Sequence, residues 1–247
     1  MSATNQMAVK VFADGADLKQ IIDLYANPVI KGFTTNPSLM RKAGVLNYEG
    51  FAREVLDKIK DRPVSFEVFA DELSTILVQA RVIASWGPNV NVKLPVTNTK
   101  GEFLGPVIRQ LSAEGVVVNV TAIMTLEQVS AVTECLDPAT PAIVSVFAGR
   151  IADTGVDPVP LMREAVKIMK ARPKAELIWA SPRELLNVIQ AAEVGCHIIT
   201  VTPDILGKLS LVGKDLDEYS LETVAMFYKD AIAAGYSINL APLSMLE

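Results

Sequence analysis

The chain has 247 residues, half of them hydrophobic, and a net charge of −5 at neutral pH, with acidic and basic residues interspersed. This balance argues against nucleic acid as the main partner, and an anionic substrate would need a local basic pocket. No apolar run approaches the roughly 18 residues that span a bilayer. The N-terminus has no basic region followed by an apolar stretch, so we expect no membrane partner and a cytoplasmic protein.

The few histidines and cysteines argue against several classes of site. His197 is the single histidine, which disfavours a Ser-His-Asp hydrolase, a Cys-His protease and a multi-histidine metal centre. Cys135 and Cys196 have neither metal-ligand spacing nor a disulfide framework. We expect no metal ion and interpret all three residues as structural.

Short β-rich runs alternate with amphipathic segments along the whole chain. Gly or Pro commonly marks the junctions, and no flexible linker divides the sequence, so we predict a single domain over residues 1–247. Strands are expected at 8–14, 30–36, 63–70, 89–96, 116–122, 142–149, 175–180 and 197–202. Helices are expected near 17–26, 47–60, 72–86, 104–114, 126–136, 158–171, 182–194 and 203–211, with a last helix at about 221–235.

Eight βα units in about 210 residues fit two architectures, a doubly wound open sheet and a closed (β/α)8 barrel. A dinucleotide-binding open sheet would carry a glycine-rich turn after its first strand. The sequence there, "FADGADL" (12–18), lacks G-x-G-x-x-G, and no Walker A motif occurs in the chain. We therefore predict a (β/α)8 TIM barrel, of the α/β class, with an additional C-terminal helix.

One expected strand, "NVNVKLPVT" (89–97), has a lysine in its centre. Side chains alternate between the two faces of a strand, and the apolar residues of this strand share one face. That face should pack against the outer helices. Lys93 on the opposite face is therefore expected to point into the barrel.

The same alternation places polar side chains inside the other strands, near their C-terminal ends, where barrel enzymes hold their active sites. It also turns the aromatic residues Phe69, Phe147 and Trp179 inward. Arg150 and Arg183 follow the sixth and seventh strands and read as a phosphate clamp. The expected inward polar residues are Asp14, Thr34, Asn36, Glu67, Asn119, Thr121, Ser145 and, just beyond its strand, Ser181.

A single lysine paired with one carboxylate could be a purely structural ion pair. Several carboxylates, amides and hydroxyls around one amine are harder to explain by stability, because buried polar groups contribute little over an apolar core. An amine held out of water loses its proton more easily, and a neutral amine beside carboxylates suits attack on a ketone and Schiff-base formation. The iminium would then be the electron sink, so we expect no flavin, nicotinamide or other cofactor.

Five segments resemble the transaldolase family, and the resemblance runs from about residue 9 to 235. They are "GFTTNPSLM" (32–40), "NVKLPVT" (91–97), "VNVTAI" (118–123), "SVFAGRIADTG" (145–155) and "WASPRE" (179–184). The short length resembles the small-subunit branch, which includes fructose-6-phosphate aldolases and compact transaldolases. Members of this branch form rings, so the resemblance implies a homo-oligomer, with a decamer of pentameric rings as the form considered.

The resemblance implies a role for each inward residue. Lys93 matches the Schiff-base lysine, and Asp14 matches the group that accepts a hydroxyl proton during carbon–carbon cleavage. Glu67, through a water held also by Thr121, matches the proton relay of the imine steps. The implied substrate contacts are Thr34, Asn36, Asn119 and Ser145 for the dihydroxyacetone unit and Arg150, Ser181 and Arg183 for phosphate.

Two positions bear on which branch activity is expected. Fructose-6-phosphate aldolases carry glutamine and tyrosine where this chain has Glu67 and Phe147, whereas transaldolases carry the residues present here. Gly15 and Pro182 depart from the family pattern without removing a catalytic group. We predict a transaldolase that moves a dihydroxyacetone unit from a ketose phosphate, such as fructose 6-phosphate or sedoheptulose 7-phosphate, to an aldose phosphate. The alternatives are an aldolase releasing free dihydroxyacetone and a non-catalytic sugar-phosphate-binding barrel.

Overall fold

The structure is a computed structural model that describes residues 9–239. These residues fall into two compact units, one ending at Leu209 and the other beginning at Ser210. The first unit holds all eight strands, and the second holds the last helix. The first residue of the strand expected at 8–14 lies outside the described residues.

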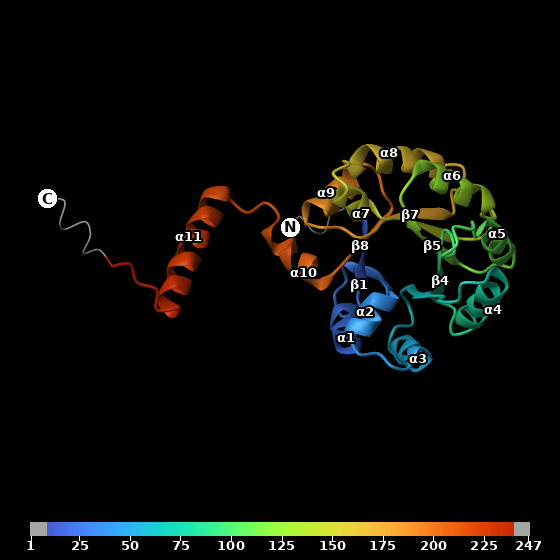
Figure 1. Cartoon of the computed structure of the whole chain (residues 1–247), viewed down its shortest axis with the longest axis horizontal. Helices are drawn as coiled ribbons and strands as arrows, with labels where there is room; N and C mark the ends of the chain where they lie inside the picture. The colour runs from blue at the N-terminus through green and yellow to red at the C-terminus, as the bar shows by residue number, and fades with distance from the viewer. Residues whose placement is uncertain (1–8, 240–247) are drawn as a thin grey trace. The chain divides into compact units, whose positions relative to one another are not determined.

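Eight parallel strands close into a barrel in chain order (Figure 1). Each strand pairs with the next one along the chain, and β1 closes the ring against β8. The predicted (β/α)8 barrel is confirmed. The strands are β1 Lys10–Asp14, β2 Ile30–Thr34, β3 Val64–Glu67, β4 Val90–Pro95, β5 Val118–Ile123, β6 Ala142–Val146, β7 Ala175–Trp179 and β8 Ile198–Val201.

Helices surround this barrel on its outer face (Figure 1). The larger ones follow the strands as the sequence pattern predicts, each with buried apolar residues facing the sheet. They are α1 Leu18–Tyr25, α3 Tyr48–Lys58, α4 Leu73–Ala84, α5 Gly105–Ala113, α6 Leu126–Cys135, α8 Pro158–Met169 and α9 Leu186–Glu193. A short helix α10, Pro203–Leu206, and a 3-10 turn η2, Gly207–Leu211, follow β8.

Two short helices were not expected; one begins directly after an expected strand and the other begins inside one. Helix α2, Pro37–Lys42, begins after Asn36, whose side chain caps it, and Pro37 suits the first helical position. Helix α7, Ala148–Asp153, begins directly after Phe147. The strands expected at 30–36 and 142–149 are therefore too long, because local capping ends β2 and a helical turn follows β6.

The apolar core has two parts. The larger one lies between the barrel and its helices and includes Val92 and Leu94 on either side of Lys93. The smaller one fills the barrel interior with Phe12, Ile143, Ile178, Ala180 and Ile198. Three of these precede by two positions the polar residues Asp14, Ser145 and Thr200. The interior is thus apolar toward the N-terminal ends of the strands and polar toward their C-terminal ends.

The inner core depends on a glycine in β2. A Cβ at Gly32 would lie 2.6 Å from the Phe12 ring, closer than packed atoms come. Glycine is therefore required where the ring of Phe12 crosses the interior. The aromatic ring then closes the barrel below Asp14, two residues further along β1.

The expected orientations of Trp179 and Phe69 are wrong. Trp179 is fully buried in the outer core, while Ile178 and Ala180 face inward. The prediction placed Trp179 and Ser181 on the same inward face, but Ser181 has a left-handed φ of 59°, which breaks the alternation. Phe69 is 64% exposed, because β3 ends at Glu67 and Phe69 lies in the following loop.

The second unit contains helix α11, Leu216–Ala233, which begins five residues before the position expected from the sequence. Asp215 sets this start, since its side chain accepts hydrogen bonds from the backbone N–H groups of Asp217 and Glu218. The helix exposes large apolar side chains, among them Leu221, Val224, Phe227, Tyr228 and Ile232. Over residues 9–239, no helix combines the length and hydropathy that a membrane span requires.

Candidate active site

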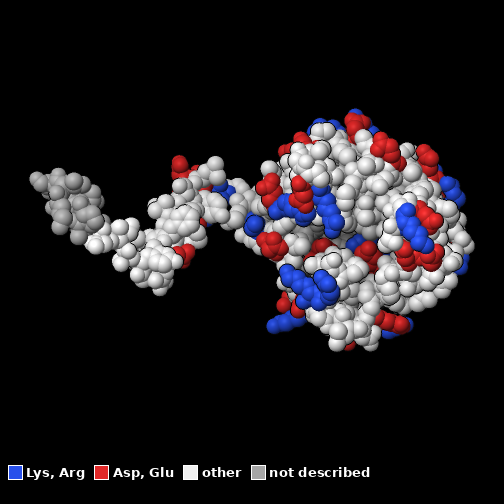
Figure 2. Space-filling model, in the orientation of Figure 1, with Lys and Arg blue, Asp and Glu red and all other residues white. Residues whose placement is uncertain are grey.

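A cavity of about 350 Å³ lies at the C-terminal ends of the strands. Figure 2 shows this face, where acidic and basic atoms lie within a hollow in the middle of the barrel. Every predicted site residue lines the cavity except Arg183. The predicted lining residues are Asp14, Thr34, Asn36, Glu67, Lys93, Asn119, Thr121, Ser145, Phe147, Arg150 and Ser181.

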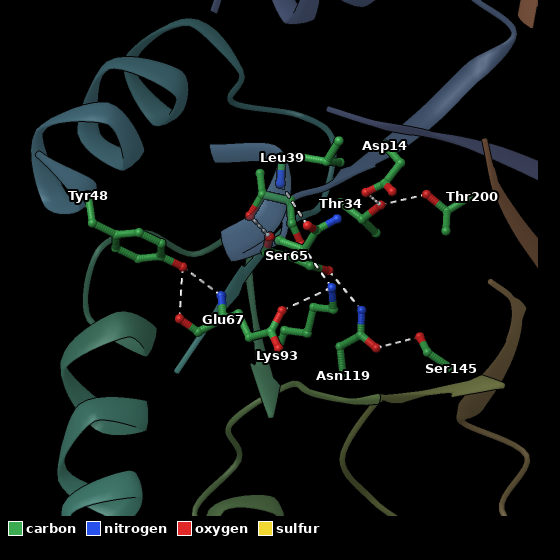
Figure 3. Close-up of polar contacts among 12 residues, drawn as sticks. Asp14, Thr34, Leu39, Tyr48, Ser65, Glu67, Lys93, Asn119, Ser145 and Thr200 are labelled. Carbon is green, nitrogen blue, oxygen red and sulfur yellow. Dashed lines mark hydrogen bonds and ion pairs between the residues drawn. The ribbon is translucent and has the colours of Figure 1, made fainter. Parts of the chain in front are cut away.

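Lys93 lies at the base of this cavity, buried to 7% exposure (Figure 3). Its Nζ donates to the backbone carbonyl of Thr35 at 2.9 Å and lies 3.1 Å from Glu67 Oε2. Lys93 and Glu67 are register neighbours on β4 and β3, so strand pairing itself brings the two side chains together. A buried ammonium requires such partners, because removing it from water is costly.

Asp14 faces the same cavity from β1. Thr34 Oγ1 donates to Asp14 Oδ1 at 2.8 Å and lies 2.5 Å from Thr200 Oγ1 (Figure 3). A hydroxyl has one hydrogen to donate, so Thr200 must donate to Thr34 in this arrangement. Burial raises the pKa of Asp14, and the charge of Lys93 and the hydrogen bond from Thr34 offset this only in part.

A second hydrogen-bonded chain crosses the cavity floor. Ser145 Oγ donates to Asn119 Oδ1 at 2.7 Å, and Asn119 Nδ2 donates to Ser65 Oγ at 3.0 Å. Beside this chain, the buried Thr121 Oγ1 has no hydrogen-bond partner among the described residues. A buried hydroxyl without a partner in a polar cavity is suited to bind a water or a ligand.

Asn36 both caps helix α2 and lines the cavity. Its Oδ1 accepts from the backbone N–H of Leu39 at 2.9 Å and so caps α2. With the oxygen engaged, the amide nitrogen of Asn36 is the group left to donate toward the cavity. The cap therefore orients the side chain that the sequence pattern assigns to the substrate.

The two arginines differ in their surroundings. Arg150 lines the cavity with its guanidinium 5.3 Å from the centre of the Phe147 ring. Arg183 is instead held by Asp153 through hydrogen bonds of 2.8 and 2.5 Å and donates to Ser181 Oγ at 3.1 Å. The Arg183 guanidinium lowers the pKa of the Asp153 carboxyl. Arg183 thus reaches the cavity rim through Ser181 rather than lining it.

The backbones at Gly149 and Ser181 lie in close contact. A Cβ at position 149 would be 1.5 Å from the Ser181 carbonyl oxygen and 3.5 Å from Arg183 Cγ. Only glycine permits this approach. The close approach joins α7, which carries Arg150, to the loop that carries Ser181 and Arg183.

Several residues of the site were missed by the sequence analysis. Thr200 lines the cavity and could have been found by applying strand alternation to β8. Ser65 lies two positions before Glu67 on β3, so the same alternation places it on the inward face, where it accepts a hydrogen bond from Asn119. Thr35 acts through its backbone carbonyl, and Tyr48 contacts Glu67 from a helix, so neither has a signal in the strand pattern.

His197 and the cysteines lie outside the cavity lining. His197, one residue before β8, accepts through Nδ1 from the backbone N–H of Leu177 in β7, and burial lowers the pKa of His197. Cys135 and Cys196 are buried free thiols. In the part of the chain that the structure describes, no group of three or more His, Cys, Asp or Glu side chains is placed to hold a metal.

Comparison with known proteins connects this site to a family. The sequence model of the "Transaldolase/Fructose-6-phosphate aldolase" family matches residues 11–239. The chain belongs to this family. It is therefore an enzyme of the transaldolase and fructose-6-phosphate aldolase type, as the resemblance of its motifs predicts.

Curated relatives agree with this assignment. A "Probable transaldolase" of Herpetosiphon aurantiacus is 35% identical over 87% of this chain and 92% of its own length. Another from Dehalococcoides mccartyi is 36% identical over 80% of this chain and 88% of its own length. The crystal structure of a "putative phosphonomutase" from Burkholderia cenocepacia covers 90% of this chain and 94% of its own, with a TM-score of 0.56. At 13% identity, it supports the fold alone.

The raised pKa of Asp14 gives a pH-dependent prediction. The folded protein holds this proton more tightly than the unfolded chain, so the Asp14 contribution to stability falls as pH rises from the ordinary pKa of 3.8 through the raised value. We expect Asp14→Asn to be more stable than the parent, by a margin that grows as pH rises above 3.8 and levels off once Asp14 has lost its proton. Urea unfolding across this range measures it.

Asp23, exposed on α1, provides the matched control. Asp23→Asn should change the free energy of unfolding by less than about 0.5 kcal/mol at every pH. An Asp14→Asn variant that shows no growing advantage over this control contradicts the desolvation of Asp14.

Proposed function

We propose that this enzyme is a transaldolase that transfers a dihydroxyacetone unit between sugar phosphates through a Schiff base on Lys93. The carrying observation is the amine of Lys93 buried in a polar cavity beside Glu67 at 3.1 Å. A structural ion pair of Lys93 and Glu67 would need neither the cavity nor the second carboxylate, Asp14, and the amides and hydroxyls that surround the pair.

Imine formation uses Lys93 and Glu67. Glu67 accepts a proton from the Lys93 ammonium, and the resulting neutral amine attacks the ketone carbon of the donor, forming a carbon–nitrogen bond. A second proton passes from the nitrogen to the former ketone oxygen and completes the carbinolamine. Glu67 then gives its proton to the hydroxyl, which leaves as water, and the iminium remains on Lys93. Thr121 supports this step, because its unpartnered hydroxyl can hold the water between Glu67 and the reacting carbon.

Carbon–carbon cleavage uses Asp14. Its carboxylate takes the proton of the donor hydroxyl next to the bond that breaks, and the raised pKa of Asp14 makes it a stronger base. The bonding electrons move into the iminium, leaving an enamine of three carbons on Lys93, and an aldose phosphate departs. Addition of this enamine to a second aldose phosphate, followed by hydrolysis, reverses each step.

The substrate contacts follow the chemistry of the cavity wall. Asn36, Asn119 and Ser145 offer donors and acceptors to the hydroxyls of the dihydroxyacetone unit. Arg150 offers a guanidinium to the phosphate at the cavity mouth, and Ser181 and Arg183 adjoin it. The long axis of the substrate would then run from Lys93 to this rim.

Reduction with borohydride tests the Schiff base. Borohydride converts an iminium into a stable secondary amine, so incubation with fructose 6-phosphate should leave a covalent adduct on the peptide that contains Lys93, read by mass spectrometry. Lys93→Met, which keeps the side-chain length, should give no adduct and no transfer. Lys10→Met is the matched control, because Lys10 pairs with Glu176 at the N-terminal ends of the strands, away from the cavity. The same adduct in Lys93→Met contradicts the proposal.

An aldolase that releases free dihydroxyacetone is the second candidate, because the family includes both activities. Phe147 favours transfer. Without a phenol in the cavity, no extra acid protonates the enamine, which therefore persists until an acceptor arrives.

Phe147→Tyr tests this choice. The added phenol should raise the ratio of dihydroxyacetone release to transfer by roughly tenfold, measured without and with an aldose phosphate acceptor. Phe147→Leu, which changes the ring without adding an acid, should leave the ratio near that of the parent. Rapid release of dihydroxyacetone by the parent without acceptor favours the aldolase.

A further inference from the structure

Strand β3 ends beside the catalytic cavity without a full set of strand neighbours. It pairs with β4 as far as Glu67, which lies opposite Lys93. Its pairing with β2 stops at Ser65, opposite Thr34, because the chain then turns into α2. The backbone of Glu67 therefore has a strand on one side only.

The backbone polar groups of Glu67 point to the side that has no strand. In a parallel sheet, the N–H and C=O of one residue face the same neighbour, and successive residues alternate. The backbone N–H of Val68 donates to Lys93 on the β4 side, whereas the carbonyl of Ser65 accepts from Thr35 on the β2 side. The backbone N–H and C=O of Glu67 therefore point to the same side as those of Ser65, into the gap left where the pairing with β2 has ended.

A single phenol fills this gap. The Glu67 backbone N–H donates to Tyr48 Oη at 2.7 Å, and Tyr48 Oη donates to the Glu67 carbonyl at 2.8 Å (Figure 3). One hydroxyl thus satisfies both groups that a neighbouring strand would have satisfied. Burial raises the pKa of Tyr48, so the phenol keeps the proton that it donates.

The phenol is itself held firmly. Tyr48 is the first residue of α3, whose start is fixed by Asn47 accepting from the Gly50 N–H at 2.9 Å. Its ring packs edge-on against Phe69 at 5.3 Å and Phe66 at 6.5 Å, with Trp86 at 5.9 Å. These contacts leave the ring little freedom to move away from Glu67.

We propose that Tyr48 is a positioning residue for the imine steps, holding the end of β3 so that the Glu67 carboxylate stays against Lys93. This inference rests on the proposed function, in which Glu67 moves protons to and from the Lys93 adduct. Without the phenol oxygen, the Glu67 backbone loses two hydrogen bonds and its carboxylate loses its fixed distance to Lys93.

Tyr48→Phe tests this role, because it removes the oxygen and keeps the ring packing. We expect kcat and the rate of borohydride-trappable imine formation on Lys93 to fall roughly tenfold, with KM little changed. Tyr25→Phe is the matched control, since the Tyr25 hydroxyl contacts Asp61 at the exposed surface. It should behave as the parent in both assays.

Two further variants separate positioning from general damage. In a Glu67→Gln background, Tyr48→Phe should slow imine formation by less than twofold more, because the group it positions is already lost. Phe66→Leu loosens the ring packing but keeps the hydroxyl, so it should lower the melting temperature with a smaller loss of trapping rate. The proposal is overturned if the losses of trapping rate in the two single variants multiply in the double variant. It is also overturned if Tyr48→Phe and Phe66→Leu lower the melting temperature equally and lose the same trapping rate.

The outcomes distinguish this inference from the proposed function. No adduct on Lys93 in the parent contradicts the Schiff-base function itself. An adduct in the parent that forms as fast in Tyr48→Phe contradicts only the role of Tyr48. If Tyr48→Phe does not fold, Asn47→Ala loosens the start of α3 and keeps the phenol; it should slow trapping to a smaller extent, and normal trapping there overturns the proposal.

Discussion

The buried pair of Lys93 and Glu67 is the interaction on which the rest of the site depends. An ammonium at 7% exposure would be too costly without the carboxylate at 3.1 Å and the Thr35 carbonyl at 2.9 Å. The pair arises from the register of β3 and β4, so the same strand pairing that closes the barrel also sets the reactive geometry. The proposed chemistry exploits this, because one group can pass a proton to the other while the barrel stays rigid.

The barrel supports that pair by dividing its interior. Phe12, admitted by Gly32, and its apolar neighbours close the interior toward the N-terminal strand ends. The hydrogen-bonded chains through Thr34 and Asn119 then occupy the layer above, where they hold the side chains of Asp14 and Asn119 in place. The left-handed backbone at Ala122 and Ser181 and the close approach at Gly149 all occur at this rim. Local strain at a functional site is sustained when the surrounding fold over-determines it.

Strand alternation predicted most of the site because β3 and β4 pair without interruption up to the cavity, and the register irregularities of the β1–β2 and β5–β6 pairs leave Asp14 and Asn119 facing it. It oriented Lys93, Asp14 and Asn119 correctly without any knowledge of their partners. It failed at Trp179, because the left-handed backbone of Ser181 means that Trp179 and Ser181 do not share a face. It also could not foresee that Asp153 holds Arg183. The contact of Tyr48 with Glu67 could not be predicted either. The Tyr48 hydroxyl takes the place of a neighbouring strand, and this place exists only because β2 ends early. Capping by Asn36, not hydrophobic pattern, decides that end.

Exchange of the ketone oxygen with solvent tests the central claim, that the Lys93 amine forms a Schiff base, most directly. Carbinolamine breakdown expels the ketone oxygen of the donor as water, and reversal in ¹⁸O-labelled water returns a labelled oxygen. The donor ketose phosphate, incubated with enzyme and no acceptor, is recovered and examined by mass spectrometry. The account predicts that label enters far faster than in buffer alone with the parent enzyme, and at the buffer rate with Lys93→Met. Transfer activity in the parent without enhanced exchange would contradict it.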